Sequence, residues 1–165
     1  MIVPLFTSLL SIRAEAAEPL RLDAEESQGK SQVTYMDCAQ PECAHMTLVC
    51  EGDSGSFGLS HAAGLAVRLI ENNDRSDLSL SFTVGRVALV AEVTSLIVAP
   101  NMAAGGWSVE FPSHDMGHVF ALIAQQPEAS VAVSVGGESF DLTPSDEDRA
   151  TLQRFAETCA KLLKR

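Results

Sequence analysis

The segment from residue 130 to residue 165 decides the fold, and it reads SVAVSVGGESFDLTPSDEDRATLQRFAETCAKLLKR. Two alternating stretches, 130–135 and 138–142, flank Gly136-Gly137, and this pattern predicts a β-hairpin. Apolar side chains then recur at three- and four-residue steps, which is the spacing of one helical stripe: Leu152, Phe155, Ala156, Cys159, Leu162 and Leu163. The segment therefore predicts a hairpin followed directly by an amphipathic C-terminal helix near 144–164.

The residues at both ends of this predicted helix fit its dipole. Thr143 is expected to be the N-cap and Pro144 to lie in the first turn. The acidic residues 146–148 would follow in that first turn, and Lys161 would lie in the last turn, so each charge complements its end of the helix. The acidic cluster of Asp141, Asp146, Glu147 and Asp148 is thus interpreted as helix-start charge and not as an acid–base pair.

The composition indicates one folded domain and excludes some partners. The chain has 165 residues, of which 46% are hydrophobic and 20% charged. Acidic residues outnumber basic ones by 22 to 11, which gives a net charge of −11. Nucleic acids and anionic membrane surfaces are therefore not expected as partners, because both require a basic surface.

The N-terminus has the features of an export signal. An apolar run over residues 2–12 precedes Ala14-Glu15-Ala16, which has the form that signal peptidase accepts. The run is too short for a permanent membrane span, although no basic residue precedes it. We expect a signal peptide at 1–16, a loose lead-in at 17–31, and a single domain at 32–165 in the periplasm or outside the cell.

The four cysteines of an exported protein predict two disulfides. Three pairings are possible, and we prefer Cys38–Cys43, which closes a short loop, with Cys50–Cys159, which joins the inward sides of a strand and of the last helix. Metal ligation by Cys38, Cys43 and Cys50 is a weaker alternative, because thiols oxidise on export. Redox catalysis is not expected, since the sequence contains no C-x-x-C.

The middle of the chain alternates between strand and turn patterns. Strands are predicted near 32–36, 45–51, 78–84, 87–93, 96–99 and 107–111, a turn at 52–58, and a helix at 113–126 capped by Ser113. Short strands followed by helices indicate an α+β fold on a mostly antiparallel β-sheet or sandwich.

Few residues qualify as a functional site. His114 and His118 lie four residues apart, and a metal ion between them would need Asp115, His45 or His61 as a further ligand. Two solvent-exposed histidines at a helix start are the simpler interpretation, so no catalytic residue, metal or cofactor is expected. The string Gly52-Asp53-Ser54-Gly55 matches a trypsin-like protease motif, but it is interpreted as a coincidence within a turn.

The candidate recognition surface is the loop at 96–106. It contains Met102 and ends beside Trp107, the only tryptophan. Trp107 is expected to pack in the core at the start of a strand, and a ligand platform is the alternative.

Several segments together resemble known exported proteins. A strand ending in Leu-Val-Cys is followed by GWSVEF, SVAVSV, SFDLTPSD and LQRFAETC. The pattern is similar to small exported proteobacterial domains of the invasion-associated locus B type, and to a type VI secretion accessory family. The resemblance implies a periplasmic β-rich domain without a catalytic centre, although the Trp-and-Cys opening of the first family is absent.

The expected function is that of an exported, non-catalytic binding or envelope accessory protein, with another envelope protein as its partner. One alternative is a proteinaceous inhibitor of a basic hydrolase such as lysozyme, because the acidic surface would attract a cationic target. Another is a small metal-dependent enzyme that uses His114 and His118.

Overall fold

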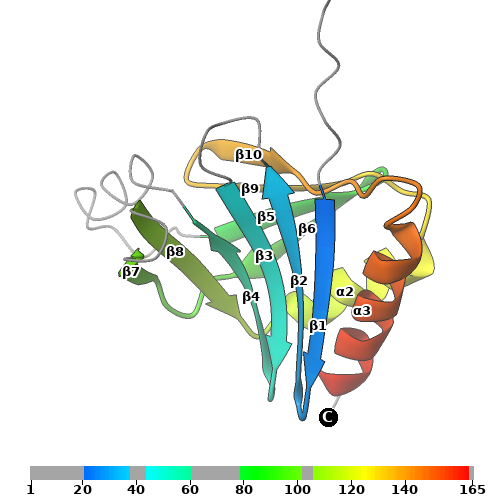
Figure 1. The fold of residues 1–165 in the computed structure, drawn as a ribbon, viewed down its shortest axis with the longest axis horizontal. Coiled ribbons are helices and arrows are strands. Elements are labelled where there is room, and N and C mark those ends of the chain that lie inside the picture. The colour runs from blue at the N-terminus through cyan, green and yellow to red at the C-terminus, as the bar shows by residue number, and fades with distance from the viewer. Residues whose placement is uncertain (1–20, 38–43, 61–78, 102–105, 164–165) are drawn as a thin grey trace, which may run out of the picture.

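The computed structural model of the chain describes residues 21–37, 44–60, 79–101 and 106–163. Within these residues two antiparallel sheets pack with two helices (Figure 1). The α+β class predicted from the sequence is confirmed, including the predominance of antiparallel sheet and the positions of an internal and a C-terminal helix. The predicted signal segment 1–16, together with Cys38, Cys43 and Met102, lies outside the described residues.

The first sheet has six strands in the order β1-β2-β3-β4-β8-β7. Its strands are β1 (Arg21–Ser27), β2 (Lys30–Asp37), β3 (Ala44–Glu51), β4 (Ser54–Leu59), β7 (Ile97–Asn101) and β8 (Gly106–Ser113). Register aligns Val33 with Leu48, Leu48 with Phe57, and Phe57 with Phe111 across four consecutive strands. All four side chains are fully buried, so this row forms the centre of the sheet's inner face.

The second sheet has four strands in the order β10-β9-β5-β6. These are β5 (Ser79–Val84), β6 (Val87–Glu92), β9 (Val131–Val135) and β10 (Glu138–Asp141). The predicted hairpin is therefore β9 and β10, with Gly136 and Gly137 in the left-handed conformation that its two-residue turn requires.

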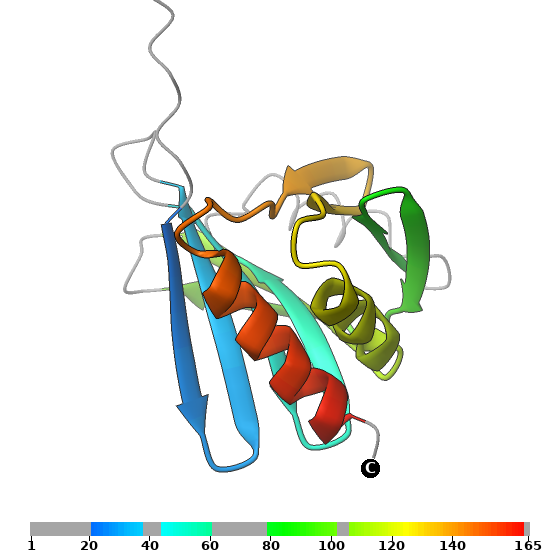
Figure 2. The same ribbon diagram turned by 90° about the vertical axis from the view of Figure 1, so that its right-hand side faces the viewer.

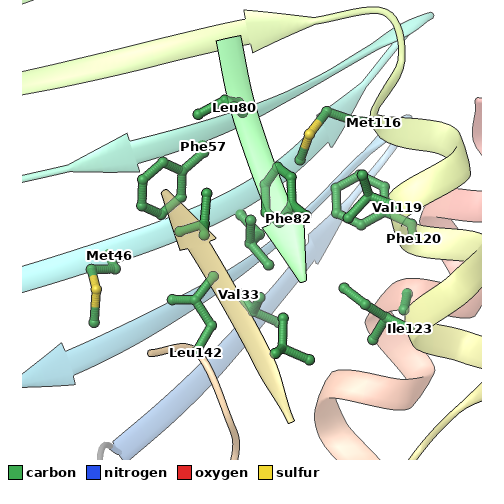
Figure 3. Packing of buried hydrophobic residues seen from close by; sticks show 14 of the residues in the cluster. Val33, Met46, Phe57, Leu80, Phe82, Met116, Val119, Phe120, Ile123 and Leu142 are labelled. Carbon is green, nitrogen blue, oxygen red and sulfur yellow. The ribbon is translucent and has the colours of Figure 1, made fainter. Parts of the chain in front are cut away.

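Two helices lie side by side against the inner face of the first sheet (Figure 2). Helix α2 (Met116–Gln125) contacts β4 and both β5 and β6, and helix α3 (Arg149–Leu162) contacts β1, β2 and β3. Phe120 of α2 meets Phe155 of α3 edge to face, with ring centroids 5.3 Å apart. The core lies between the helices and the two sheets, and Phe57, Phe82 and Phe120 are its largest labelled side chains in Figure 3.

A disulfide joins the first sheet to the last helix. Cys50 of β3 and Cys159 of α3 are both fully buried, with Cα atoms 5.6 Å apart and a sequence separation of 109. The structure thus contains the longer of the two disulfides predicted from the sequence.

The lead-in predicted at 17–31 is wrong for its described part. Residues 21–27 form β1, and β2 already begins at Lys30. Leu22 is buried, whereas Asp23, Glu25 and Glu26 are exposed. An edge strand with charged outward positions has a polar composition, and the sequence pattern therefore resembled a loop.

The turn predicted at 52–58 is also wrong, because only Gly52 and Asp53 form the turn and residues 54–59 form β4. Gly55 allows close packing of a helix on this strand. A Cβ at this position would lie 2.5 Å from the Cβ of Met116 and 3.0 Å from a ring carbon of Phe120. The glycines and serines of the segment therefore satisfy sheet packing and not only turn geometry.

Both helices begin later than predicted. Ser113 ends β8 instead of capping a helix, and its hydroxyl accepts a hydrogen bond from the Asp115 N–H. Thr143 is not the cap of α3, because its hydroxyl accepts a hydrogen bond from the Val131 N–H over 3.0 Å. The acidic residues 146–148 precede the first turn of α3 rather than lying in it.

Candidate binding groove

The outer face of the six-stranded sheet carries a groove along β4. The outward positions of this strand and of the residue after it have small side chains: Ser54, Ser56, Gly58 and Ser60. The neighbouring strands carry larger ones, Thr47 and Val49 on β3 and Glu110 and Pro112 on β8. The difference in side-chain size leaves a groove of about 410 Å³.

The floor of this groove requires a glycine at position 58. A Cβ at position 58 would collide with the Thr47 hydroxyl. Thr47 and Gly58 are directly opposite each other in the β3–β4 register. The Thr47 side chain therefore occupies the space that a side chain at position 58 would need. With glycine at position 58, the groove stays open there.

Two hydrogen bonds fix hydroxyl groups along the groove. The Ser60 Oγ accepts from the His45 N–H at 2.7 Å, where the β3–β4 pairing ends. On the opposite side, the Ser108 Oγ donates to the Ala99 carbonyl at 3.3 Å. Both oxygens line the groove and keep further hydrogen-bonding capacity for a ligand, because a hydroxyl can donate once and accept twice.

The groove is polar and carries little net charge. At one end, Lys30 Nζ lies 3.7 Å from Glu51 Oε2, and both side chains are largely exposed, so these charges offset each other. Glu110 adds a negative charge on the β8 side. The arrangement favours a ligand that is rich in hydrogen-bonding groups and either neutral or weakly cationic.

Residues 52–58 have the composition of a turn, so the sequence does not predict this groove. The sequence nonetheless contains a pattern that fits the groove. Phe57 and Leu59 point inward, while serine or glycine occupies every outward position from 54 to 60. A strand with one apolar face and one face of only small residues indicates a depression in a sheet surface. Gly52 and Asp53 form a turn, and Ser54 begins β4.

The two histidines of the predicted pair lie on different elements. His114 lies in the turn before α2, and its Nδ1 is 3.4 Å from the Asp53 carbonyl oxygen. His118 lies on the helix itself, and both side chains are exposed. Among the residues that the structure describes, no three histidine, cysteine or acidic side chains come together in a way that would hold a metal ion.

Trp107 does not pack in the core as expected. It lies near the start of β8, opposite Pro100 of β7, and its side chain is 40% exposed. Val109 and Phe111, on the same face of the strand, are buried. Trp107 lies two residues before Val109, which pairs with Leu59 at the described end of β4. The alternative role of Trp107 as a ligand platform stays a prediction. The role of Met102 in a recognition surface also stays a prediction.

Among the described residues, the hydroxyl of Tyr35 on the inner face is the buried side-chain polar group without a partner. The Tyr35 hydroxyl on β2 makes no hydrogen bond to the described part of the chain. Burial raises the pKa of this phenol far above its usual value, and the negative charges of Asp148 and Asp141 raise it further. Tyr35 is therefore neutral in the folded protein and lies on the opposite face of the sheet from the groove.

Comparisons with protein-family models, with curated proteins and with solved structures yield no match to this chain. None of the described helices has the length and apolar character needed to cross a membrane.

Proposed function

We propose that the protein is an exported, non-catalytic binding protein of the cell envelope, and that the groove along β4 is its ligand site. The observation that carries this proposal is the row of small residues on an otherwise well-packed strand. Cavities with converging polar groups are the usual places for ligands. A periplasmic setting also agrees with the resemblance to small exported proteobacterial domains, which stays a prediction.

The Cys50–Cys159 disulfide supports export. Such bonds form and persist in oxidising compartments and are rare in the reducing cytosol. Both cysteines are fully buried, so the bond serves structure and not thiol exchange. This supports a periplasmic or secreted location for the chain.

The shape of the groove favours an extended polypeptide segment of another envelope protein as the ligand. The flanking strands β3 and β8 are two strand spacings apart, about 10 Å, which admits one extended chain. Hydroxyl groups along both sides can pair with its peptide groups. Among the described residues that line the groove there is no tryptophan, tyrosine or phenylalanine ring on which a sugar would stack.

Filling the groove tests the proposal. Ser56→Trp would occupy the floor, whereas Ser139→Trp places the same ring on an exposed position of β10. With a photo-crosslinker at Ser108, we expect the wild type and Ser139→Trp to crosslink one envelope protein and Ser56→Trp to lose that product. Equal crosslinking by both tryptophan variants, with melting temperatures unchanged, would contradict the groove as the site.

A cationic hydrolase such as lysozyme is a second candidate partner, and β1 is the observation that favours it. This edge strand exposes Asp23, Glu25 and Glu26 on a chain of net charge −11. Inhibition of such an enzyme by the wild type should depend on the salt concentration. Replacing these three acidic residues by Asn or Gln should abolish the inhibition. Inhibition that persists in this variant would exclude β1 as the contact.

A further inference from the structure

The four edges of the two sheets differ in how they are protected. Exposed edge strands pair readily with other strands, and proteins normally block them with charges, proline or short length. β1 carries Asp23, Glu25 and Glu26, β7 contains Pro100, which has no N–H, and β10 has only four residues. β6 has six residues and no proline, and its only charged residue, Glu92, lies at the end of the strand.

The hydrogen-bonding groups on the open edge of β6 follow from its register. A two-residue turn joins β5 to β6, with Val84 opposite Val87. In an antiparallel pair the backbone groups alternate between the partner strand and the outside, so those of Ala88 and Val90 point outward. The Glu92 N–H also points outward, and it donates to the Asp115 carboxylate at 3.1 Å. The groups available for pairing are therefore those of Ala88 and Val90.

We propose that this edge pairs with β6 of a second copy of the chain about a two-fold axis at Leu89. Ala88 of each copy then lies opposite Val90 of the other, which satisfies all the outward-pointing groups of both residues. The two four-stranded sheets become one continuous sheet. Because Glu92 already uses its N–H within its own chain, a register centred on Val90 would leave pairing groups unmatched.

The side chains complement each other in this register. The stretch from 86 to 92 reads RVALVAE, with a positive charge at one end and a negative charge at the other. About the axis, Arg86 faces Glu92 of the second copy on both sides, and neither residue forms an ion pair within the described residues of its own chain. Opposite charges directly across strands stabilise a pair, and like charges oppose it.

Pairing also covers exposed apolar surface. Val90 is 67% exposed and Val87 is 40% exposed, which makes them two of the most exposed large apolar residues described. The inward side chains of Val87 and Leu89 would extend the core across the axis. This surface belongs to the second sheet, so the inference is independent of the groove on the first sheet and goes beyond the proposed function.

Sedimentation of the exported, disulfide-bonded chain tests the inference. We expect a concentration-dependent dimer that strengthens with added salt, because two chains of charge −11 repel each other. Val90→Lys should weaken the dimer by about tenfold or more, since an edge lysine opposes strand pairing. The matched control Ile97→Lys, on the exposed edge strand β7, should leave the dimer unchanged. A wild-type monomer at every concentration, or equal effects of the two lysines, would overturn the inference.

Charge exchange tests the register itself. Arg86→Glu places two acids together at each end of the interface, and Glu92→Arg places two bases together, so each variant should dimerise less than the wild type. A mixture of the two variants restores opposite pairs at both ends and should form a heterodimer. The double variant should also recover the dimer. If the mixture associates no better than either variant alone, this register is wrong.

Discussion

At the scale of single residues, Tyr35 links burial to the pH dependence of stability. It is the only tyrosine, and its hydroxyl is buried without a hydrogen-bond partner among the described residues. Burial, with the charges of Asp148 and Asp141, raises its pKa in the folded protein. The unfolded chain would titrate near pH 10. Above that pH only the unfolded chain releases the proton, so folding stability falls as pH rises.

Tyr35→Phe tests this connection. We expect the variant to equal or exceed the wild type in stability at neutral pH, because it removes an unpaired buried hydroxyl, a change of about 1 kcal/mol. We also expect it to lack the loss of up to about 1.4 kcal/mol per pH unit above pH 10 that Tyr35 causes. Urea unfolding at several pH values measures both effects. A folded wild type that shows phenolate absorbance near pH 10 would contradict the assignment.

Gly55 shows how a residue with a turn-like composition serves packing. A Cβ at this position meets Met116 and Phe120 of α2. Gly55→Ala should therefore lower the free energy of unfolding by about 1–3 kcal/mol through overpacking. Ser54→Ala, one residue earlier on the outward side, is the control and should change it by less than about 0.5 kcal/mol. Similar losses in both variants would mean that helix packing is not the constraint at position 55.

At the scale of elements, the sequence predicted those strands and helices whose apolar residues repeat regularly. The hairpin around Gly136-Gly137 and the stripe of α3 from Leu152 to Cys159 are present as expected. β1 and β4 were missed for different reasons. β1 is an acidic edge strand with a single buried large side chain, Leu22, and β4 is rich in serine and glycine because one face forms a groove and the other packs on a helix.

The candidate site was less predictable than the fold, because it depends on which strands are neighbours. β4 pairs with β8, which lies about fifty residues later in the chain, and no local pattern indicates that pairing. Thr143 illustrates the same point at a helix start. It has the residue type of an N-cap, but tertiary structure uses its hydroxyl to hold Val131 of β9 instead.

Ser145 caps the turn that leads into α3, whose own N-cap residue is Asp148. Its hydroxyl accepts a hydrogen bond from the Asp148 N–H at 3.3 Å and donates one to the Asp148 carboxylate at 2.9 Å. Ser145→Ala should lower stability by about 1 kcal/mol, which is the usual effect of losing a cap. The exposed Ser130, whose side chain makes no hydrogen bond to the described residues, gives the control variant Ser130→Ala. Thermal unfolding of both variants would show whether Ser145 has this role, and equal melting temperatures would count against it.

At the scale of the whole molecule, few connections join the two ends of the chain. Helix α3 packs on strands from the N-terminal part, and Arg149 at its start binds the segment after α2. Its Nε lies 3.6 Å from Glu128, and its Nη1 donates to the Pro127 carbonyl at 3.3 Å. These contacts are partly exposed and contribute little individually. The last helix is therefore held by its buried apolar stripe and by the covalent link between β3 and α3.

Of the two predicted disulfides, Cys50–Cys159 should contribute more to stability. Its closed loop of 109 residues corresponds to about 4–5 kcal/mol in the chain-entropy account, whereas the predicted Cys38–Cys43 loop corresponds to about 3 kcal/mol or less. Cys50→Ala/Cys159→Ala should therefore lower the free energy of unfolding by more than Cys38→Ala/Cys43→Ala does. Both double variants avoid leaving an unpaired thiol, and urea unfolding without reductant measures the difference. Equal losses in the two double variants would contradict the larger contribution of the Cys50–Cys159 disulfide.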